Sequence, residues 1–430
     1  MKLLIVSPDY ASHVAPMVQI GRAWQHRFGS VIVATGDSVR ASVEAEGLDW
    51  THLRLGKGSN NGIIRAEGQP AGEDDHLREF FAATRAGAVE TLRYQATARQ
   101  HDLLFEPERV LCELSSIMAA IRPDRVLVDH VAFGARLALH ALGVEAATIV
   151  LGHPTALPAR GELYGLPPVW PSALQPCADE LAGLRQICAE SAQGLTSASN
   201  QILDRFAPFQ PRLDDLTRLA GHPTIYNYPT ELHDKDRELP ARSVSIGALR
   251  RDEDLWSTRL PDGTGWFVMV ALGTFLSSRS DILSAAVSAA HLGSWRLALA
   301  SGSTPIGALG PLPNGAVVGE HLPQVALLRF ADVLVTHGGN NSVTEACASG
   351  VPMVVLPMST DQFAGARAIE KAGIGIVLDP NQVTAESLRD AVEAVLASSA
   401  TQRIRELAQS IAKVGGAAAA AAAIHRQDTQ

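Results

Sequence analysis

Along the first 150 residues, short apolar runs rich in β-branched side chains alternate with stretches whose apolar positions recur at helical spacing. Runs that are apolar at nearly every position are typical of strands in a parallel sheet whose two faces are covered by helices. The pattern therefore predicts a doubly wound α/β domain, with helices over 16–28 and 133–142 and two more between 77 and 121. The predicted strands are Leu3–Ser7, Ser30–Thr35, Arg125–Val128 and Ala146–Leu151.

The same alternation begins again in the second half of the chain. Between the halves, Tyr228–Gly265 is rich in charges, contains three prolines and has no apolar period, so we interpret it as a connection between domains. We predict an N-terminal domain over 1–235, a linker over 236–262 and a second domain over 263–414. Two Rossmann-like domains that face a cleft offer a favourable place for a ligand. The second set of strands is Trp266–Leu272, Trp295–Leu299, Val333–Thr336 and Met353–Leu356.

Composition narrows the possible functions. The 430 residues include 36 Lys and Arg against 45 Asp and Glu, a formal charge of −9, which argues against binding to a nucleic-acid backbone. The four cysteines share no C-x-x-C spacing, so neither a disulfide scaffold nor a zinc ribbon is indicated. No window approaches the roughly 20 apolar residues of a membrane span, and the apolar run at the N-terminus is too short for a signal peptide. We expect a cytoplasmic protein without a membrane span.

The segment 321–362 is the most informative part of the sequence. A predicted strand ends at Thr336, Gly338 and Gly339 let the backbone approach a ligand, and a helix begins near Asn341, capped by that residue or by Ser342. A helix N-terminus beside glycines is an anion site. Taken alone, however, the segment is better explained as an ordinary strand–turn–helix in which Ser342 and Glu345 form a capping box.

A longer series of residues favours a binding site over an ordinary strand–turn–helix. The chain contains, in order and at fixed spacing, Pro323–Gln324, His337, Gly339, Asn341, Ser342, Glu345, Gly350–Pro352, Pro357 and Asp361–Gln362. This series resembles the donor-binding signature of family 1 glycosyltransferases, the group that includes macrolide, glycopeptide and plant natural-product transferases. The family pattern is P-Q, then H-x-G-x-N-S-x-x-E, then G-V-P, then P-x-x-x-D-Q.

The resemblance implies how a nucleotide-sugar donor is held. His337 and the backbone from Gly338 to Ser342 would bind the diphosphate, and Thr274, after the strand Trp266–Leu272, would meet the phosphates from the opposite wall. Glu345 would accept hydrogen bonds from the ribose hydroxyls. The remaining implied contacts are Gln324 near the nucleoside, Asp361 and Gln362 on the transferred sugar, and His321 against the base, where the family often has Trp. The smaller ring of His321 leaves uracil and thymine both open.

The N-terminal half supplies a candidate catalytic pair. His13 lies between the first strand and the first helix, at the carboxyl end of a strand, where α/β proteins bind ligands. A lone histidine in a loop is more often a surface or core residue, but the family places a general base here in a G-H-x-x-P motif, in which Ser12 replaces Gly. Asp129 ends a strand at the same sheet edge, where the family has an aspartate that orients this histidine.

The resemblance implies a GT-B fold, with the acceptor in the N-terminal domain, the donor in the second domain and a final helix, 415–430, that crosses back to the first. Loops 56–76 and 152–177 would shape the acceptor pocket. The implied reaction is inverting transfer from a UDP- or TDP-sugar to a hydroxyl of a small hydrophobic acceptor such as a polyketide, in antibiotic or other natural-product biosynthesis. The helix N-terminus and His337 would neutralise the diphosphate, so that neither a metal nor a cofactor is needed.

Two alternatives stay open. One is a catalytically inactive glycosyltransferase-like partner protein, and the other is a nucleotide-sugar epimerase of the GT-B type. The sugar, the base, the acceptor, the need for an activator and the oligomeric state, a homodimer included, are not determined by the sequence.

Overall fold

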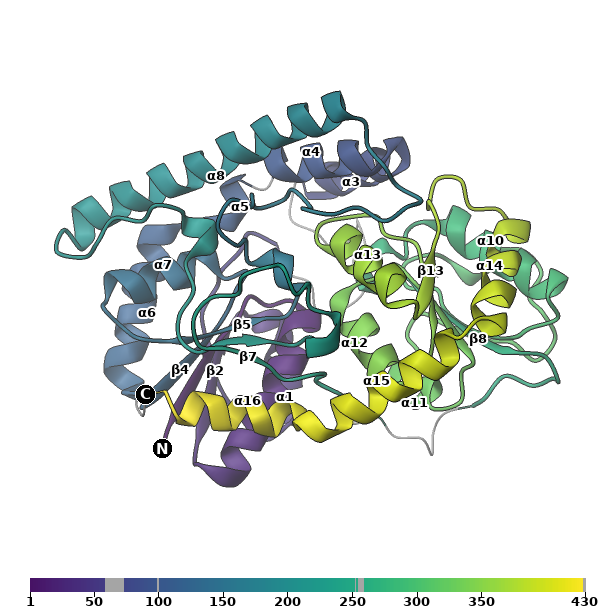
Figure 1. The fold of residues 1–430 in the computed structure, drawn as a ribbon. Helices are drawn as coiled ribbons and strands as arrows, with labels where there is room; N and C mark the ends of the chain where they lie inside the picture. Colours follow the sequence, from purple (N-terminus) through teal and green to yellow (C-terminus); the bar gives the residue numbers. More distant parts are fainter. Residues whose placement is uncertain (59–72, 99, 252, 254–258, 428–430) are drawn as a thin grey trace.

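A computed structural model describes residues 1–58, 73–98, 100–251, 253 and 259–427. Within these residues the strands form two parallel sheets, of seven and six strands, with helices on both faces (Figure 1). The first sheet has the order β3-β2-β1-β4-β5-β6-β7. Its strands are β1 (Leu3–Val6), β2 (Val31–Thr35), β3 (Asp49–His52), β4 (Arg125–Asp129), β5 (Ala147–Val150), β6 (Thr224–Tyr226) and β7 (Ser243–Ser245).

Eight α-helices lie in the described part of the first half. The expected pair of helices between 77 and 121 is split further, because Gly87, with φ of +141°, interrupts the first of them. The helices are α1 (Ala11–Arg27), α2 (Arg40–Ala45), α3 (Glu73–Ala86), α4 (Ala88–Ala98), α5 (Gln100–Leu103), α6 (Pro107–Ile121), α7 (Phe133–Ala141) and α8 (Ala178–Phe206). Short 3₁₀ turns add η1 (Asp37–Val39), η3 (Pro154–Ala156), η4 (Leu216–Arg218) and η5 (Thr230–Leu232).

The second sheet has the order β10-β9-β8-β11-β12-β13. Its strands are β8 (Phe267–Ala271), β9 (Arg296–Ala300), β10 (Val317–Gly319), β11 (Val333–Thr336), β12 (Met353–Val355) and β13 (Gly375–Val377). The accompanying helices are α9 (Gly273–Leu276), α10 (Ser280–Leu292), η6 (Ile306–Leu309), α11 (Gln324–Leu328), α12 (Asn340–Ser349), α13 (Gln362–Ala372), α14 (Ala385–Ala397), α15 (Ala400–Val414) and α16 (Gly416–His425). The doubly wound α/β architecture expected from the apolar pattern is confirmed in both halves.

Each sheet reverses its strand order at one point. In the first sheet the chain runs outward from β1 to β3 and returns to β4, which pairs with β1 in register Leu3↔Arg125. In the second sheet it runs from β8 to β10 and returns to β11, which pairs with β8. Loops that leave adjacent parallel strands in opposite directions open a crevice at the carboxyl edge of the sheet. The segments after β1, β4, β8 and β11 therefore border the two crevices.

One strand lies where only a connection was expected. Ser243–Ser245 forms β7 and pairs in parallel with β6, although it falls inside the predicted linker 236–262. The strand is only three residues long and carries serine on both sides of Val244, so it has no apolar run that the sequence pattern could reveal. Residues 252 and 254–258 of the same stretch lie outside the described residues.

The C-terminal helices cross from one sheet to the other (Figure 1). Helix α15 packs Ile404, Leu407 and Ile411 into the core beside the second sheet, and the chain then bends at Gly415, with φ of +94°. Helix α16 lies against α1, where the rings of Phe28 and His425 stack with centroids 4.3 Å apart. Residues 428–430 of the expected final helix are outside the described part.

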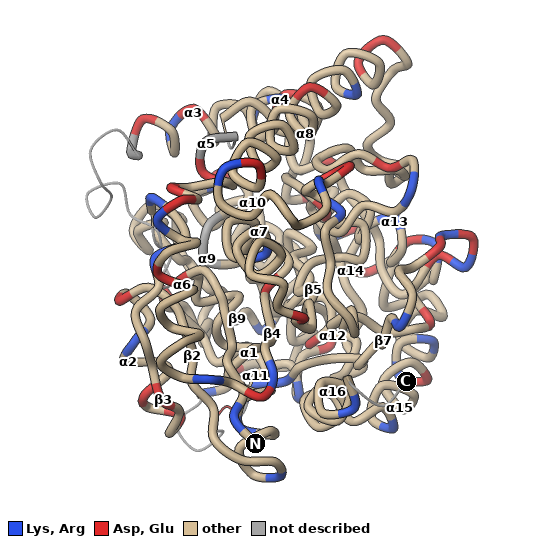
Figure 2. Tube along the Cα trace, turned by 90° about the vertical axis from the view of Figure 1, so that its left-hand side faces the viewer, with Lys and Arg blue, Asp and Glu red and all other residues tan. Residues whose placement is uncertain are grey.

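By length and composition alone, Ala400–His425 could cross a membrane, but a core helix of a folded protein passes the same test. The run of alanines raises the mean hydropathy of this stretch. In the structure the buried side chains of α16, Ala420, Ala421, Ala423 and Ile424, join the core of the first sheet. Around the described periphery of the molecule, acidic and basic residues are intermixed (Figure 2).

The packing of α16 can be tested by placing a charge in it. Ala421 is fully buried, whereas Ala418 on the same helix is exposed. Ala421→Glu should lower the free energy of unfolding by about 3 kcal/mol, because the carboxylate loses its water without gaining a partner. Urea unfolding followed by circular dichroism measures the effect. Ala418→Glu, the matched control, should change stability by less than about 0.5 kcal/mol, and equal losses in the two variants would contradict this packing.

Candidate active site

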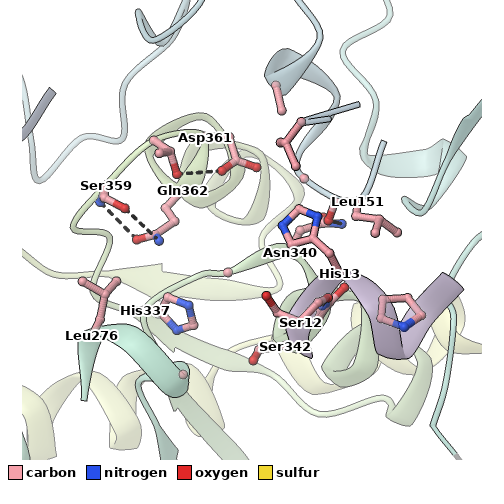
Figure 3. Close-up of a pocket in the computed structure, with 18 of the residues that line it drawn as sticks. Ser12, His13, Leu151, Leu276, His337, Asn340, Ser342, Ser359, Asp361 and Gln362 are labelled. Carbon is pink, nitrogen blue, oxygen red and sulfur yellow. Dashed lines mark hydrogen bonds between the residues drawn. The ribbon is translucent and has the colours of Figure 1, made fainter. Parts of the chain in front are cut away.

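A cavity of about 580 Å³ lies between the two sheets and is lined by residues from both halves of the chain. Figure 3 shows Ser12 and His13 on one side of it and His337 and Gln362 on the other. The elements that reach the cavity include the segments after β1, β4, β8 and β11, which border the two strand-order reversals.

The expected catalytic pair is in contact. His13 Nδ1 lies 2.7 Å from Asp129 Oδ2, with the His13 side chain 21% exposed and the Asp129 side chain fully buried. Burial opposes the charged form of Asp129, but attraction to His13 and hydrogen bonds from His13 and His130 hold the pKa of this carboxyl well below its usual value. Because an ionised carboxylate only accepts hydrogen bonds, His13 carries its proton on Nδ1, and Nε2 is the acceptor nitrogen of the ring.

His13 does not lie in a loop as expected. Helix α1 begins at Ala11, so His13 belongs to its first turn and Pro16 lies within the helix. Proline has no N–H, and Pro16 therefore cannot donate to the carbonyl four residues earlier, that of Ser12. That carbonyl instead accepts a hydrogen bond from Asn341 Nδ2 at 2.7 Å. The proline thus frees a backbone acceptor that joins the first half of the site to the second.

His130 was missed by the sequence analysis. It is buried, its Nδ1 lies 3.1 Å from Asp129 Oδ1, and its ring is stacked on that of His13 with centroids 6.1 Å apart. Consecutive residues of a strand point to opposite faces, so a neighbour of Asp129 was not expected beside the same carboxylate. Because β4 ends at Asp129, the alternation stops there and both imidazoles reach one aspartate.

His337 is held between two glycines. A Cβ atom on Gly273 would lie 2.8 Å from the His337 ring, and one on Gly339 would also clash with it. Burial lowers the pKa of His337 to about 4, so at neutral pH the ring is a neutral hydrogen-bond donor. A neutral His337 would contribute to a diphosphate site through its N–H group and not through a positive charge. Gly338 and Gly339 precede α12, whose first N–H groups have no acceptor within the helix.

Glu345 is buried and engaged by side chains on both of its oxygens. Arg251 Nε donates to Oε1 at 3.1 Å and Nη2 to Oε2 at 3.3 Å, while Gln324 Nε2 donates to Oε2 at 2.7 Å. Burial raises the pKa of Glu345, and Arg251 and Gln324 oppose that rise. Gln324 also donates to Ser342 Oγ at 3.1 Å. The capping-box explanation is therefore wrong: Gly339 is the N-cap of α12, without a side-chain cap.

Two expected sugar contacts are already occupied by protein groups. The Asp361 carboxylate accepts a hydrogen bond from the backbone N–H of His153, in the other half of the chain. Gln362 Oε1 accepts from the backbone N–H groups of Met358 and Ser359, at 3.0 and 3.1 Å, and so closes its own loop (Figure 3). Both residues still line the cavity.

His321, which was expected to contact the base of the donor, is exposed and lines the cavity. Thr274 lies in α9, but its side chain is outside the described part of the structure.

The wall of the cavity in the first half is mostly apolar. It includes Leu92 of α4, Leu103 of α5, Val131 after β4, and Tyr164 and Leu166 from the loop after β5. The loop 152–177 thus contributes as expected, whereas the contribution of α4 was not anticipated. Residues 59–72 of the other expected loop lie outside the described residues.

Comparison with known proteins finds glycosyltransferases similar to this chain. Residues 249–409 match the model of the UDP-glucoronosyl and UDP-glucosyl transferase family. The NDP-glycosyltransferase YjiC of Bacillus licheniformis is 24% identical over 80% of this chain and 87% of its own length. The oleandomycin glycosyltransferase of Streptomyces antibioticus is 28% identical over 73% of this chain and 70% of its own. The demethyllactenocin mycarosyltransferase of Streptomyces fradiae is 36% identical, but over only 34% of its length.

Solved structures agree on the fold. The glycotransferase of kitacinnamycin superimposes with a TM-score of 0.71 at 24% identity, covering 99% of this chain and 98% of that one. The calicheamicin glycosyltransferase CalG4 gives 0.72 at 20% identity, covering 99% and 97%. With the two facing sheets and the donor signature already described, these likenesses show that the chain is a glycosyltransferase of the GT-B fold.

Proposed function

We propose that this enzyme transfers a sugar, with inversion, from a UDP- or TDP-sugar to a hydroxyl of a small, hydrophobic secondary metabolite of the polyketide kind. The observation that carries the proposal is the 2.7 Å contact of His13 with buried Asp129, across one cavity from the N-terminus of α12. A macrolide-like acceptor is supported by the names of the oleandomycin and demethyllactenocin relatives.

In the proposed reaction His13 is the general base. Its Nε2 takes the proton of the acceptor hydroxyl while the oxygen attacks the anomeric carbon, and the bond from that carbon to the diphosphate breaks in the same displacement. Attack from the face opposite the leaving group inverts the configuration. Asp129, ionised and fully buried, stabilises the imidazolium that forms. His130, on the other carboxylate oxygen, would keep Asp129 oriented toward His13.

The leaving diphosphate would be stabilised by backbone dipoles. The free N–H groups at the start of α12 point to the cavity end occupied by Gly339 and Ser342, and the neutral His337 adds a donor beside them. Among the described residues, no group of three or more His, Cys, Asp or Glu side chains could hold a metal ion. Because backbone dipoles can stabilise the diphosphate, we propose that the reaction needs neither a metal nor an organic cofactor.

The apolar wall favours this proposal over the two alternatives. An epimerase acts on the nucleotide sugar itself and needs no apolar pocket for a second substrate, whereas this cavity has one formed by Leu92, Leu103, Val131 and Leu166. An inactive partner protein needs no buried His13–Asp129 pair. The direct test is incubation with panels of UDP- and TDP-sugars and macrolide or phenolic acceptors, with mass spectrometry of the product and NMR of its anomeric configuration. Epimerised donor without a glycoside, or a glycoside of retained configuration, would contradict the proposal.

The general base can be tested separately from binding. His13→Ala should lower kcat by roughly 10²–10⁴-fold with an alcohol acceptor and leave the Kd of UDP or TDP near that of the wild type. Asp129→Asn should also lower kcat, and the double variant should be little worse than His13→Ala, because both residues serve one proton transfer. A phenol assayed at pH 9, already partly ionised, should be affected less than an alcohol. Unchanged turnover of an alcohol by His13→Ala would assign the base to another group.

Metal independence has its own experiment. Initial rates measured with excess EDTA should equal those without it, since the proposed charge stabilisation comes from α12 and His337. Added Mg²⁺ or Mn²⁺ should change the rate less than twofold. Activity that is lost with EDTA and restored by either ion would show that the diphosphate is stabilised in another way.

A further inference from the structure

Arg251 has a position that no sequence motif indicated. It follows the first sheet, in the stretch expected to be only a connection, and its guanidinium enters the cavity to pair with Glu345. Among the described residues that line the cavity, it is the only lysine or arginine. The nearby His337 is neutral at neutral pH because burial lowers its pKa to about 4. Arg251 is thus the permanent positive charge of the described cavity wall.

The pair with Arg251 restricts what else Glu345 can bind. A carboxylate has about four acceptor positions, and three of them are used, two by Arg251 and one by Gln324. A ribose has two neighbouring hydroxyls to donate. Both can reach Glu345 only if at least one guanidinium N–H leaves it. The ligand-free arrangement therefore occupies the acceptor positions that the expected ribose contact requires.

Exposure indicates which partner can move. The Arg251 side chain is 43% exposed, whereas that of Glu345 is 3% exposed and is also held by Gln324. The chain beside Arg251 is anchored, because Glu253 accepts hydrogen bonds from the backbone N–H groups of Val325 and Ala326, at 2.8 and 3.2 Å. Arg251 Nη1 also lies 3.6 Å from Glu253 Oε1, so an exchange needs a rotation of the long Arg251 side chain away from both carboxylates. Glu345 stays where it is.

A destination for the guanidinium lies in the same network. Gln324 bonds both Glu345 and Ser342, so the ion pair and the first turn of α12 are joined through one side chain. That turn is where the diphosphate is expected. A guanidinium binds phosphate oxygens through charge-assisted, bidentate hydrogen bonds. The diphosphate also carries more negative charge than the Glu345 carboxylate that the guanidinium would leave.

We propose that donor binding makes Arg251 exchange partners: the ribose hydroxyls take its place on Glu345, and its guanidinium pairs with the diphosphate. This inference rests on the donor site of the proposed function and adds to it a specificity device. A nucleoside without phosphates has to break the Arg251–Glu345 pair and offers the guanidinium nothing in return. A nucleoside diphosphate breaks the same pair and replaces it. The residue therefore selects for the diphosphate over the bare nucleoside.

The test compares affinities along a series. Isothermal titration gives the Kd of uridine, UMP and UDP, or of the thymidine series if that binds better, for the wild type and for Arg251→Gln. UDP should bind at least about tenfold more weakly to Arg251→Gln, the usual worth of a charge-assisted hydrogen bond, whereas uridine should bind as in the wild type or more tightly. Arg251→Lys, which keeps the charge without the bidentate geometry, should recover part of the UDP affinity.

Arg250→Gln is the matched control, because Arg250 is exposed and its substitution should leave every Kd unchanged. If Arg251→Gln bound uridine and UDP more weakly by the same factor, the arginine would only position Glu345. If it bound both more tightly by the same factor, the arginine would only compete with the ligand for Glu345. Either result, or no change in any Kd, overturns the exchange. A wild-type protein that binds none of the nucleotides would instead refute the proposed function, so the two failures are distinguishable.

Discussion

The parallel pairing of β1 with β4, and of β8 with β11, is the constraint on which the whole site depends. His13 and Asp129 are 116 residues apart, and they meet because β1 and β4 are neighbours whose carboxyl ends share one edge. The second sheet repeats this geometry, so Gly273 after β8 lies against the ring of His337 after β11. Any slip of either strand pair would displace the contact of His13 with Asp129 or that of Gly273 with His337. The buried apolar strands thus determine the chemistry indirectly.

The polar groups of the cavity are satisfied by one another before any ligand binds. Asn341 donates to the Ser12 carbonyl, Asn340 donates to the carbonyls of Leu151 and Asn227 at 2.8 and 2.9 Å, and the Asp361 carboxylate accepts from His153. A buried polar group without a partner lowers the stability of the fold. These contacts therefore hold the two halves of the chain together. A donor that contacts these side chains would have to replace their hydrogen bonds. Asn340, Asn341 and Asp361 each bond to the first half of the chain.

The apolar pattern predicted the doubly wound architecture, and the spaced signature predicted many of the residues that line the cavity. Each feature that was not predicted has a physical reason. Strands with continuous apolar runs were located, because burial on both faces leaves a strong signal, whereas β7, a three-residue strand of alternating serine and valine, leaves none. The His13–Asp129 contact followed from the resemblance and the shared sheet edge. His130 could not be predicted because the strand alternation fails at the end of β4. Arg251 could not be predicted because the partner of a long charged side chain depends on tertiary structure.

The charges of the cavity raise a question about how it holds an anion. Its described lining includes three carboxylates, Glu320, Glu345 and Asp361, against the single guanidinium of Arg251. Fixed backbone N–H groups at the start of α12 attract a diphosphate without a mobile cation and at any pH. A lining rich in lysine and arginine would bind the donor more tightly, but it would bind the released diphosphate product just as tightly. Affinity that is equal in the ground state and the transition state does not raise kcat. A cavity whose described lining has a single arginine, and relies on backbone N–H groups for the rest of its attraction, can therefore recognise the donor and still release the product.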